Sequence, residues 1–165
     1  MFAGLIDWWR ERSLPRGHHR RIRAARRTLD LLNGWLRQDA DAAPRCFAYL
    51  RKIDPLAFEE LILEAFRRTG IRVKRGRRYS GDGGVDGHVR RDGRWCPIQC
   101  KRYKSAINPA HVTDFSRIVE RSRAPRGYFI HTGRTGDASW SARGSDVQMI
   151  SGQRLIDLLL GQAPR

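Results

Sequence analysis

The sequence is poor in acidic residues and in lysine. Its 165 residues hold 17 aspartates and glutamates against 33 lysines and arginines, a formal net charge of +16, and only four of the basic residues are lysines. Since 40% of the residues are hydrophobic, the chain can bury a core, which excludes a disordered basic tail. So large an excess of positive charge favours a polyanionic partner, with nucleic acids first and anionic membrane surfaces second.

Cysteines and long apolar runs are also scarce. The three cysteines form an odd count without paired metal-binding spacing, so we expect free thiols in a reducing compartment and no zinc site. The longest apolar stretch near the N-terminus, residues 2–9, is interrupted by Asp7 and is too short to span a membrane. We therefore expect a soluble cytoplasmic protein, associated with the nucleoid, and no membrane partner.

The first 52 residues are predicted to form a basic helical extension. Apolar residues from Leu29 to Leu36 recur near helical spacing, and six arginines precede them with no acidic residue among them. Two interpretations explain this pattern equally well. The helix is either a DNA-contacting arm, or its basic face lies in solvent or is weakly attracted to a membrane. The six arginines are Arg16, Arg20, Arg21, Arg23, Arg26 and Arg27. We place a domain boundary after this extension, with residues 53–165 as the second unit.

From residue 54 onward the sequence alternates between helical and strand patterns. Asp54-Pro55 is typical of a helix start, because the carboxylate can cap and proline suits the first helical position. The pattern predicts a helix at 55–69, strands at 71–74, 85–91 and 94–102, a helix at 108–121, a strand at 127–131, a helix at 137–142, a strand at 147–150 and a helix at 153–160. This order indicates an α/β fold.

Asp92-Gly93 is a strong hairpin signal between the second and third predicted strands. If these are the two loop residues, the partners across the hairpin have numbers that sum to 185, which places Asp86 opposite Gln99. Because side chains alternate along a strand, Lys101 lies on the same face as Gln99. Three polar groups are therefore predicted to converge on one face of the sheet.

A further carboxylate comes from the helix predicted before these strands. Helical spacing places Glu59 at the border of the apolar stripe, whereas Glu60 and Glu64 point away from it. A partly buried Glu59 beside Asp86 would need compensating positive charge, and Lys101 together with a divalent metal would supply it. A site of this kind suits phosphodiester hydrolysis. A hydrogen-bonded surface pair of Asp86 and Lys101 explains the spacing equally well, so both interpretations stay open.

Three segments resemble the Mrr-type restriction endonuclease catalytic domain of the PD(D/E)xK nuclease superfamily. They are Phe58-Glu59, Gly81-Asp82-Gly83-Gly84-Val85-Asp86-Gly87 and Ile98-Gln99-Cys100-Lys101-Arg102-Tyr103, and the similarity extends from about residue 54 to 160. The resemblance implies a restriction-endonuclease-like α/β core of order α-β-β-β-α-β, in which helices flank a mixed central sheet.

The resemblance also implies a role for each candidate site residue. Asp86 would be the principal metal-binding aspartate, and Glu59 the helix carboxylate. Gln99 would be the variant of the usual second acidic residue, and Lys101 the lysine that helps to activate water. The backbone carbonyl of Cys100 would complete the coordination of Mg²⁺, for which Mn²⁺ can substitute. Products would carry 5′-phosphate and 3′-hydroxyl ends.

Basic residues flank these motifs in the sequence and are predicted to contact DNA phosphates without reading bases. They are Arg72, Lys74, Arg75, Arg77, Arg78, Arg102 and Lys104. The 52-residue extension is too short for a winged-helix reader domain, so the resemblance implies no sequence or methylation specificity.

The sequence thus predicts a Mg²⁺-dependent DNA endonuclease that acts in restriction or defence against modified or foreign DNA. Coordinated cleavage of both strands would need two active sites. We therefore expect either a homodimer or a complex with an unknown protein partner. The alternative is a non-catalytic DNA-binding module that keeps the nuclease fold and acts with a partner.

Overall fold

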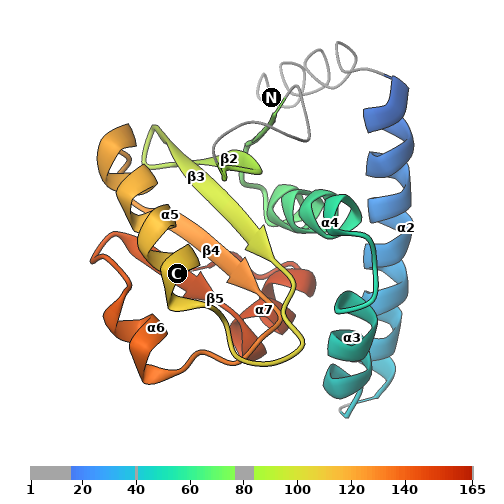
Figure 1. The fold of residues 1–165 in the computed structure, drawn as a ribbon. Coiled ribbons are helices and arrows are strands. Elements are labelled where there is room, and N and C mark those ends of the chain that lie inside the picture. Colours follow the sequence, from blue (N-terminus) through green and yellow to red (C-terminus); the bar gives the residue numbers. More distant parts are fainter. Residues whose placement is uncertain (1–15, 40, 77–83, 165) are drawn as a thin grey trace.

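The structure is a computed structural model that describes residues 16–39, 41–76 and 84–164 (Figure 1). Its elements are α2 (Arg16–Gln38), α3 (Ala43–Leu50), α4 (Pro55–Arg68), β1 (Val73–Arg75), β2 (Gly87–Arg91), β3 (Arg94–Lys101), α5 (Pro109–Ser122), β4 (Gly127–His131), α6 (Asp137–Ser141), β5 (Val147–Ile150) and α7 (Gly152–Leu159). Every element predicted from residue 54 onward is present, with its ends within two residues of the prediction.

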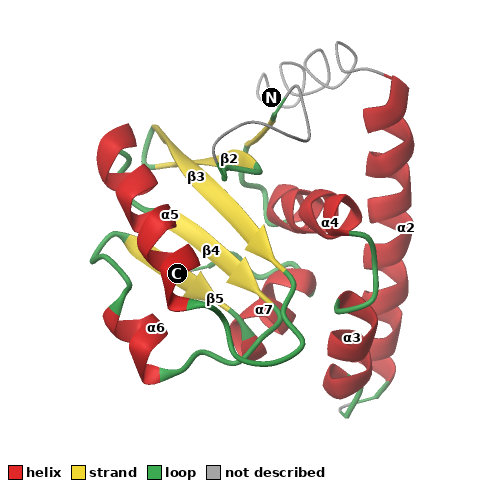
Figure 2. Ribbon diagram, in the orientation of Figure 1, coloured by secondary structure: helices red, strands yellow, loops and turns green. Residues whose placement is uncertain are grey.

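The strands form one five-stranded sheet in the order β1-β2-β3-β4-β5 (Figure 2). The first three strands pair antiparallel, and β3, β4 and β5 pair parallel. One core cluster joins α2, α3, α4 and α7 to one face of the sheet, and a second lies between α5 and the other face. The predicted mixed sheet flanked by helices is confirmed.

The β2–β3 hairpin has the register that the sequence predicts. Gly87 pairs with Ile98, and His88 pairs with Pro97. Asp92 and Gly93 have φ values of 49° and 76°, and a two-residue turn of type I′ needs positive φ at both positions. Because Asp and Gly tolerate this conformation, the dipeptide sets the register of the whole hairpin.

The helices before residue 52 pack on α4. Leu29 and Leu32 of α2 are fully buried and share a core cluster with α4, as do Cys46 and Leu50 of α3. Figure 1 shows α2 running beside α4, on the side of α4 away from the sheet. Helix α4 is therefore covered on two sides, and the division after residue 52 stays a prediction.

Two glutamates of α4 correct the sequence analysis. Glu60 and Glu64, predicted to point away from the core, are 1% and 0% exposed. Glu60 Oε2 accepts a hydrogen bond from Arg75 Nε at 2.8 Å, and Glu64 Oε1 accepts one from Arg26 Nε at 3.1 Å. The prediction was wrong because helical periodicity marks the apolar face of a helix but cannot show that another helix covers its polar face.

Cys46, Cys96 and Cys100 are buried free thiols, as the sequence predicts. Within the described ranges, the structure contains no helix whose length and apolar character would let it cross a membrane.

Candidate active site

Gln99 and Lys101 lie side by side on one face of β3. In the parallel ladder they pair with Phe129 and His131 of β4, and Phe129 belongs to the core cluster under α5. Asp86 directly precedes β2, and its backbone N–H donates to Ile98 O at 2.9 Å. Gly87 already pairs with Ile98, so this bond places Asp86 at the end of the ladder, and the predicted pairing of Asp86 with Gln99 stays a prediction.

Asp86 has a fixed carboxylate. Its Oδ2 accepts a hydrogen bond from the backbone N–H of Cys100 at 2.6 Å, beyond the point where the β2–β3 ladder ends. The Asp86 carboxylate thus accepts the Cys100 N–H in place of a backbone carbonyl of β2, because β2 does not pair with β3 at this point. Burial raises the pKa of Asp86 to about 6, against the lowering effects of the Cys100 N–H and of the Lys101 charge. The carboxylate is held in place in a poorly solvated position.

Glu59 reaches the same place from α4. Burial, then the charges of Asp86 and Glu60, raise the pKa of Glu59 to about 8, and Lys101 acts in the opposite direction. These interactions place Glu59 of α4 within electrostatic range of Asp86 and Lys101. Ionising both carboxylates would need more positive charge than Lys101 supplies.

Gln99 supplies a buried oxygen with no partner. Its side chain is 7% exposed, and Oε1 lacks a hydrogen bond to any described residue. The Nε2 end lies against Gly84, where a Cβ would come within 2.8 Å of Nε2 and where φ is +89°. Since buried acceptors are nearly always satisfied, this oxygen is free for a ligand.

These donors fit a hard divalent cation. Glu59 and Asp86 provide carboxylates, Gln99 an amide oxygen and Cys100 a backbone carbonyl, and Mg²⁺ prefers oxygen ligands of this kind. The described segments contain no group of three or more His, Cys, Asp or Glu side chains that could hold a metal.

The residues predicted to contact DNA differ in how exposed they are. Lys74 and Lys104 are exposed, and Arg72 and Arg102 are half-buried. Arg75 is 6% exposed and forms ion pairs with Glu60 and Glu64, so the structure gives it a role in the core in place of the predicted DNA contact. Its charge is unavailable because the carboxylates of α4 already neutralise it. Arg77 and Arg78 lie outside the described residues.

Arg51 and Thr132 are structural partners of the site that sequence reasoning missed. Arg51 Nε and Nη2 donate to Thr132 O, and Thr132 Oγ1 bonds both the N–H and the carbonyl of Tyr103. These contacts join the end of α3 to the segment that follows Lys101. The two partners are 81 residues apart, and no local pattern connects them.

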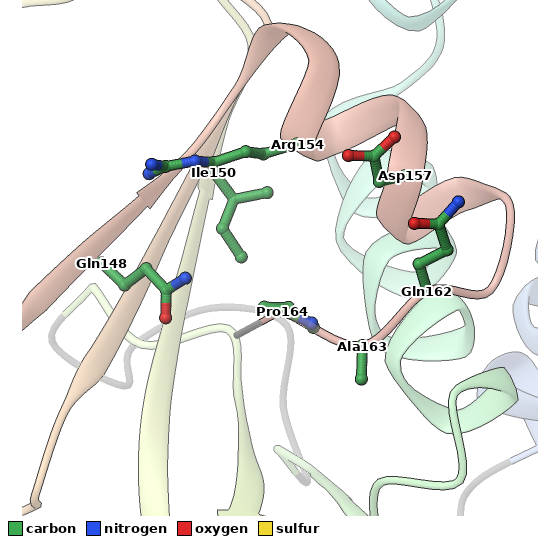
Figure 3. Close-up of a pocket in the computed structure, with 7 residues that line it drawn as sticks. All are labelled: Gln148, Ile150, Arg154, Asp157, Gln162, Ala163 and Pro164. Atoms are coloured by element: carbon green, nitrogen blue, oxygen red, sulfur yellow. The ribbon is translucent and has the colours of Figure 1, made fainter.

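A separate pocket of about 350 Å³ lies between β5, α7 and the C-terminal segment (Figure 3). It is lined by Gln148, Ile150, Arg154, Asp157, Gln162, Ala163 and Pro164. None of the predicted site residues lines it.

Known proteins match the core of this chain. Residues 50–159 match the restriction endonuclease family of the Mrr catalytic type. No curated protein matches the chain. The solved structure of MspJI restriction endonuclease in complex with a 27-mer oligonucleotide matches with a TM-score of 0.50 and 27% sequence identity, over 71% of this chain and 31% of that chain. This chain thus corresponds to about a third of the solved chain. Its α/β sheet with flanking helices is the restriction-endonuclease-like fold that the sequence predicts, and the chain belongs to the restriction endonuclease family with an Mrr-type catalytic domain.

Proposed function

We propose that this restriction-type nuclease is a Mg²⁺-dependent DNA endonuclease whose catalytic residues are Glu59, Asp86, Gln99 and Lys101. The observation that carries the proposal is the position of Asp86. Its carboxylate is fixed on the Cys100 N–H and interacts with the charges of Glu59 and Lys101. A structural surface pair would not need a half-buried second carboxylate or a buried amide oxygen that no described residue satisfies.

Asp86, Glu59, the Gln99 amide oxygen and the Cys100 carbonyl would hold the cation. When bound, a divalent cation supplies positive charge that polarises the phosphate and the attacking water. Mn²⁺ would substitute, because it accepts the same oxygen ligands.

The residues of the chain then have distinct tasks. The Cys100 N–H keeps the Asp86 carboxylate in one orientation, so no reorganisation is needed when the substrate arrives. The Lys101 ammonium would orient the attacking water and stabilise the negative charge that develops on the phosphate. The water oxygen would attack phosphorus in line with the 3′ oxygen, so that a new P–O bond forms as the P–O3′ bond breaks. The water would give up one proton to solvent, and the 3′ oxygen would take one up. The products would carry 5′-phosphate and 3′-hydroxyl ends.

DNA is the substrate we propose. The related MspJI structure holds an oligonucleotide, and a net charge of +16 suits a polyanion. Exposed Lys74 and Lys104, with half-buried Arg72 and Arg102, would contact phosphates. The protein would act in the cytoplasm in restriction or defence. It would cut both strands as a homodimer or with a protein partner, because one site cuts one strand.

The test measures cleavage of supercoiled plasmid, methylated and unmethylated, in Mg²⁺, Mn²⁺ or EDTA. Asp86→Ala and Lys101→Ala should each lower cleavage by about 100-fold or more, because Asp86 would hold the cation and the Lys101 charge would stabilise the transition state. DNA binding, followed in parallel, should persist. Exposed Asp114→Ala and Lys52→Ala are the matched controls and should cut like the wild type.

Equal cleavage by wild type, Asp86→Ala and Lys101→Ala would refute the assigned site. The absence of cleavage by the wild type in every metal, with DNA binding unchanged in both variants, would instead favour the non-catalytic DNA-binding module.

A further inference from the structure

The outer face of α2 carries three exposed arginines. Arg20, Arg23 and Arg27 are spaced three and four residues apart, which aligns them in one stripe along the helix. We call them the α2 arginine stripe. Among the described residues, none of the three has an ion-pair partner. By contrast, the neighbouring Arg26 pairs with Glu64 at 3.1 Å, so its charge is used within the fold.

Nearby acidic residues do not neutralise the stripe. Helix α2 contains one acidic residue, Asp30, and its Oδ1 lies 2.8 Å from Arg68 Nη1. Glu64 on α4 is completely buried and already contacts Arg26, Arg67 and Arg75. No carboxylate in the described part of the chain therefore compensates the positive charge of the stripe.

The opposite face of α2 is already used by the core. Ile22, Ala25, Leu29 and Leu32 are buried, and Leu29 and Leu32 pack in the cluster that contains α4. An amphipathic helix binds a bilayer by inserting its apolar face. Helix α2 could do so only by leaving the core, so its outer face suits a polyanion better than a membrane.

We propose that the α2 arginine stripe binds the phosphate backbone of duplex DNA as a second contact, apart from the active site. From Arg20 to Arg27 the helix rises by about 10 Å at ~1.5 Å per residue. One DNA strand carries a phosphate about every 3.4 Å along the duplex axis, so the stripe matches roughly three phosphates. Arginine suits phosphate because its planar guanidinium donates two parallel hydrogen bonds.

Figure 1 places α2 on the far side of α4 from the sheet, so this surface differs from the one formed by the ends of β2 and β3. Contacts to phosphates position DNA without reading its sequence. The α2 arginine stripe is not part of the proposed active site. Its proposed role rests on the proposed function only because DNA is named as the partner. The stripe would raise affinity for DNA of any sequence.

The experiment measures binding of a fluorescent 30-base-pair duplex by anisotropy between 50 and 300 mM NaCl. All proteins are full-length and carry Lys101→Ala, so that no cleavage interferes. The test variant combines Arg20→Gln, Arg23→Gln and Arg27→Gln. Its charge-matched control combines Arg117→Gln, Arg121→Gln and Arg123→Gln, exposed positions on or next to α5, the helix that covers the other face of the sheet.

The test variant should bind at least about tenfold more weakly at 100 mM salt. The slope of log K against log salt should become shallower by ~0.9 for each lost phosphate contact, up to about 2.7 for three. The control should keep the slope and affinity of the parent protein. A triple lysine variant at the stripe should retain most of the slope, because lysine keeps the charge, and thermal melts would verify that every variant is folded.

Three results would overturn the inference. The test variant could match the parent protein, or test and control variants could lose the same affinity, which would indicate an effect of net charge alone. The stripe substitutions could instead abolish binding to phosphatidylserine vesicles while DNA binding is unchanged, which would assign α2 to a membrane surface. Because this assay contains no cleavage step, a failure of the proposed nuclease activity would leave its result intact.

Discussion

The guanidinium of Arg51 donates two hydrogen bonds to the carbonyl oxygen of Thr132, from Nε at 3.1 Å and from Nη2 at 2.9 Å. Thr132 Oγ1 accepts a bond from Tyr103 N at 2.9 Å and donates one to Tyr103 O at 3.0 Å. Arg102 Nη1 donates to the Arg51 carbonyl at 3.1 Å. The end of α3 and the segment after Lys101 therefore belong to one hydrogen-bonded network.

We expect Arg51→Gln to slow cleavage by about tenfold or more at saturating DNA, because Lys101 would lose part of its support and small misplacements are costly in catalysis. DNA affinity should stay unchanged. The free energy of unfolding should fall by about 2 kcal/mol, the usual effect of losing hydrogen bonds from a charged donor. Arg45→Gln, an exposed change on the same helix, is the control. Wild-type cleavage by Arg51→Gln would contradict the prediction.

Divalent cations should stabilise the folded protein through Glu59 and Asp86. Mg²⁺ should raise the melting temperature over that in EDTA, since a ligand that binds only the folded state stabilises it. In Glu59→Gln this rise should shrink, because one anionic ligand is gone. Without metal the variant should be at least as stable as the wild type, because it no longer buries a carboxylate beside Asp86. A full Mg²⁺ response in Glu59→Gln would exclude Glu59 as a ligand.

Glu64→Gln should lower the free energy of unfolding by about 2–3 kcal/mol, because it removes the buried charge that Arg67, Arg26 and Arg75 share. Burial opposes ionisation of Glu64, but these arginines outweigh it, so its pKa lies below the ordinary 4.5. The stabilisation is therefore complete above about pH 4.5 and disappears as the pH falls through the lowered pKa. Urea titrations between pH 3 and 7 should show the two proteins converging in acid. Exposed Glu120→Gln should follow the wild type throughout.

His131 should make the protein sensitive to mild acid. It is fully buried, its Nε2 lies 3.1 Å from Thr135 Oγ1, and burial lowers its pKa from 6.5 to about 4. Between these values the unfolded chain binds the proton first, so stability falls as the pH drops from about 6.5 to 4, by up to about 3 kcal/mol. His131→Gln should flatten this part of the pH–stability curve. A full loss of stability between pH 6.5 and 4 in His131→Gln would refute the assignment.

Local signals predicted the part of the site that depends on β2 and β3. Asp92-Gly93 sets the hairpin register, strand alternation places Gln99 and Lys101 on one face of β3, and Asp86 comes directly before β2. The position of Glu59 at the border of the apolar stripe was likewise predicted from helical spacing. These features were accessible because each depends on residues close in sequence.

Contacts between distant segments could not be predicted in this way. Arg75 has the sequence context of a solvent-facing DNA contact, yet it is buried because Glu60 and Glu64 lie opposite it. The bond between Arg51 and Thr132 likewise requires α3 to meet the end of β4. Periodicity shows which side of an element is apolar, but it cannot show which charged side chains the fold brings together.

The central position of β3 determines how the site can move. β3 pairs antiparallel with β2 along residues 94–98 and parallel with β4 along residues 98–101, and beyond the end of β2 the Asp86 carboxylate accepts the Cys100 N–H. Amides in such a strand exchange with solvent only when much of the protein opens. Gln99 and Lys101 are thus built on a segment whose backbone should be among the slowest to exchange deuterium. Adjustment to different DNA shapes must then come from the elements around β3, while the reacting groups keep their spacing through many cycles of binding and release.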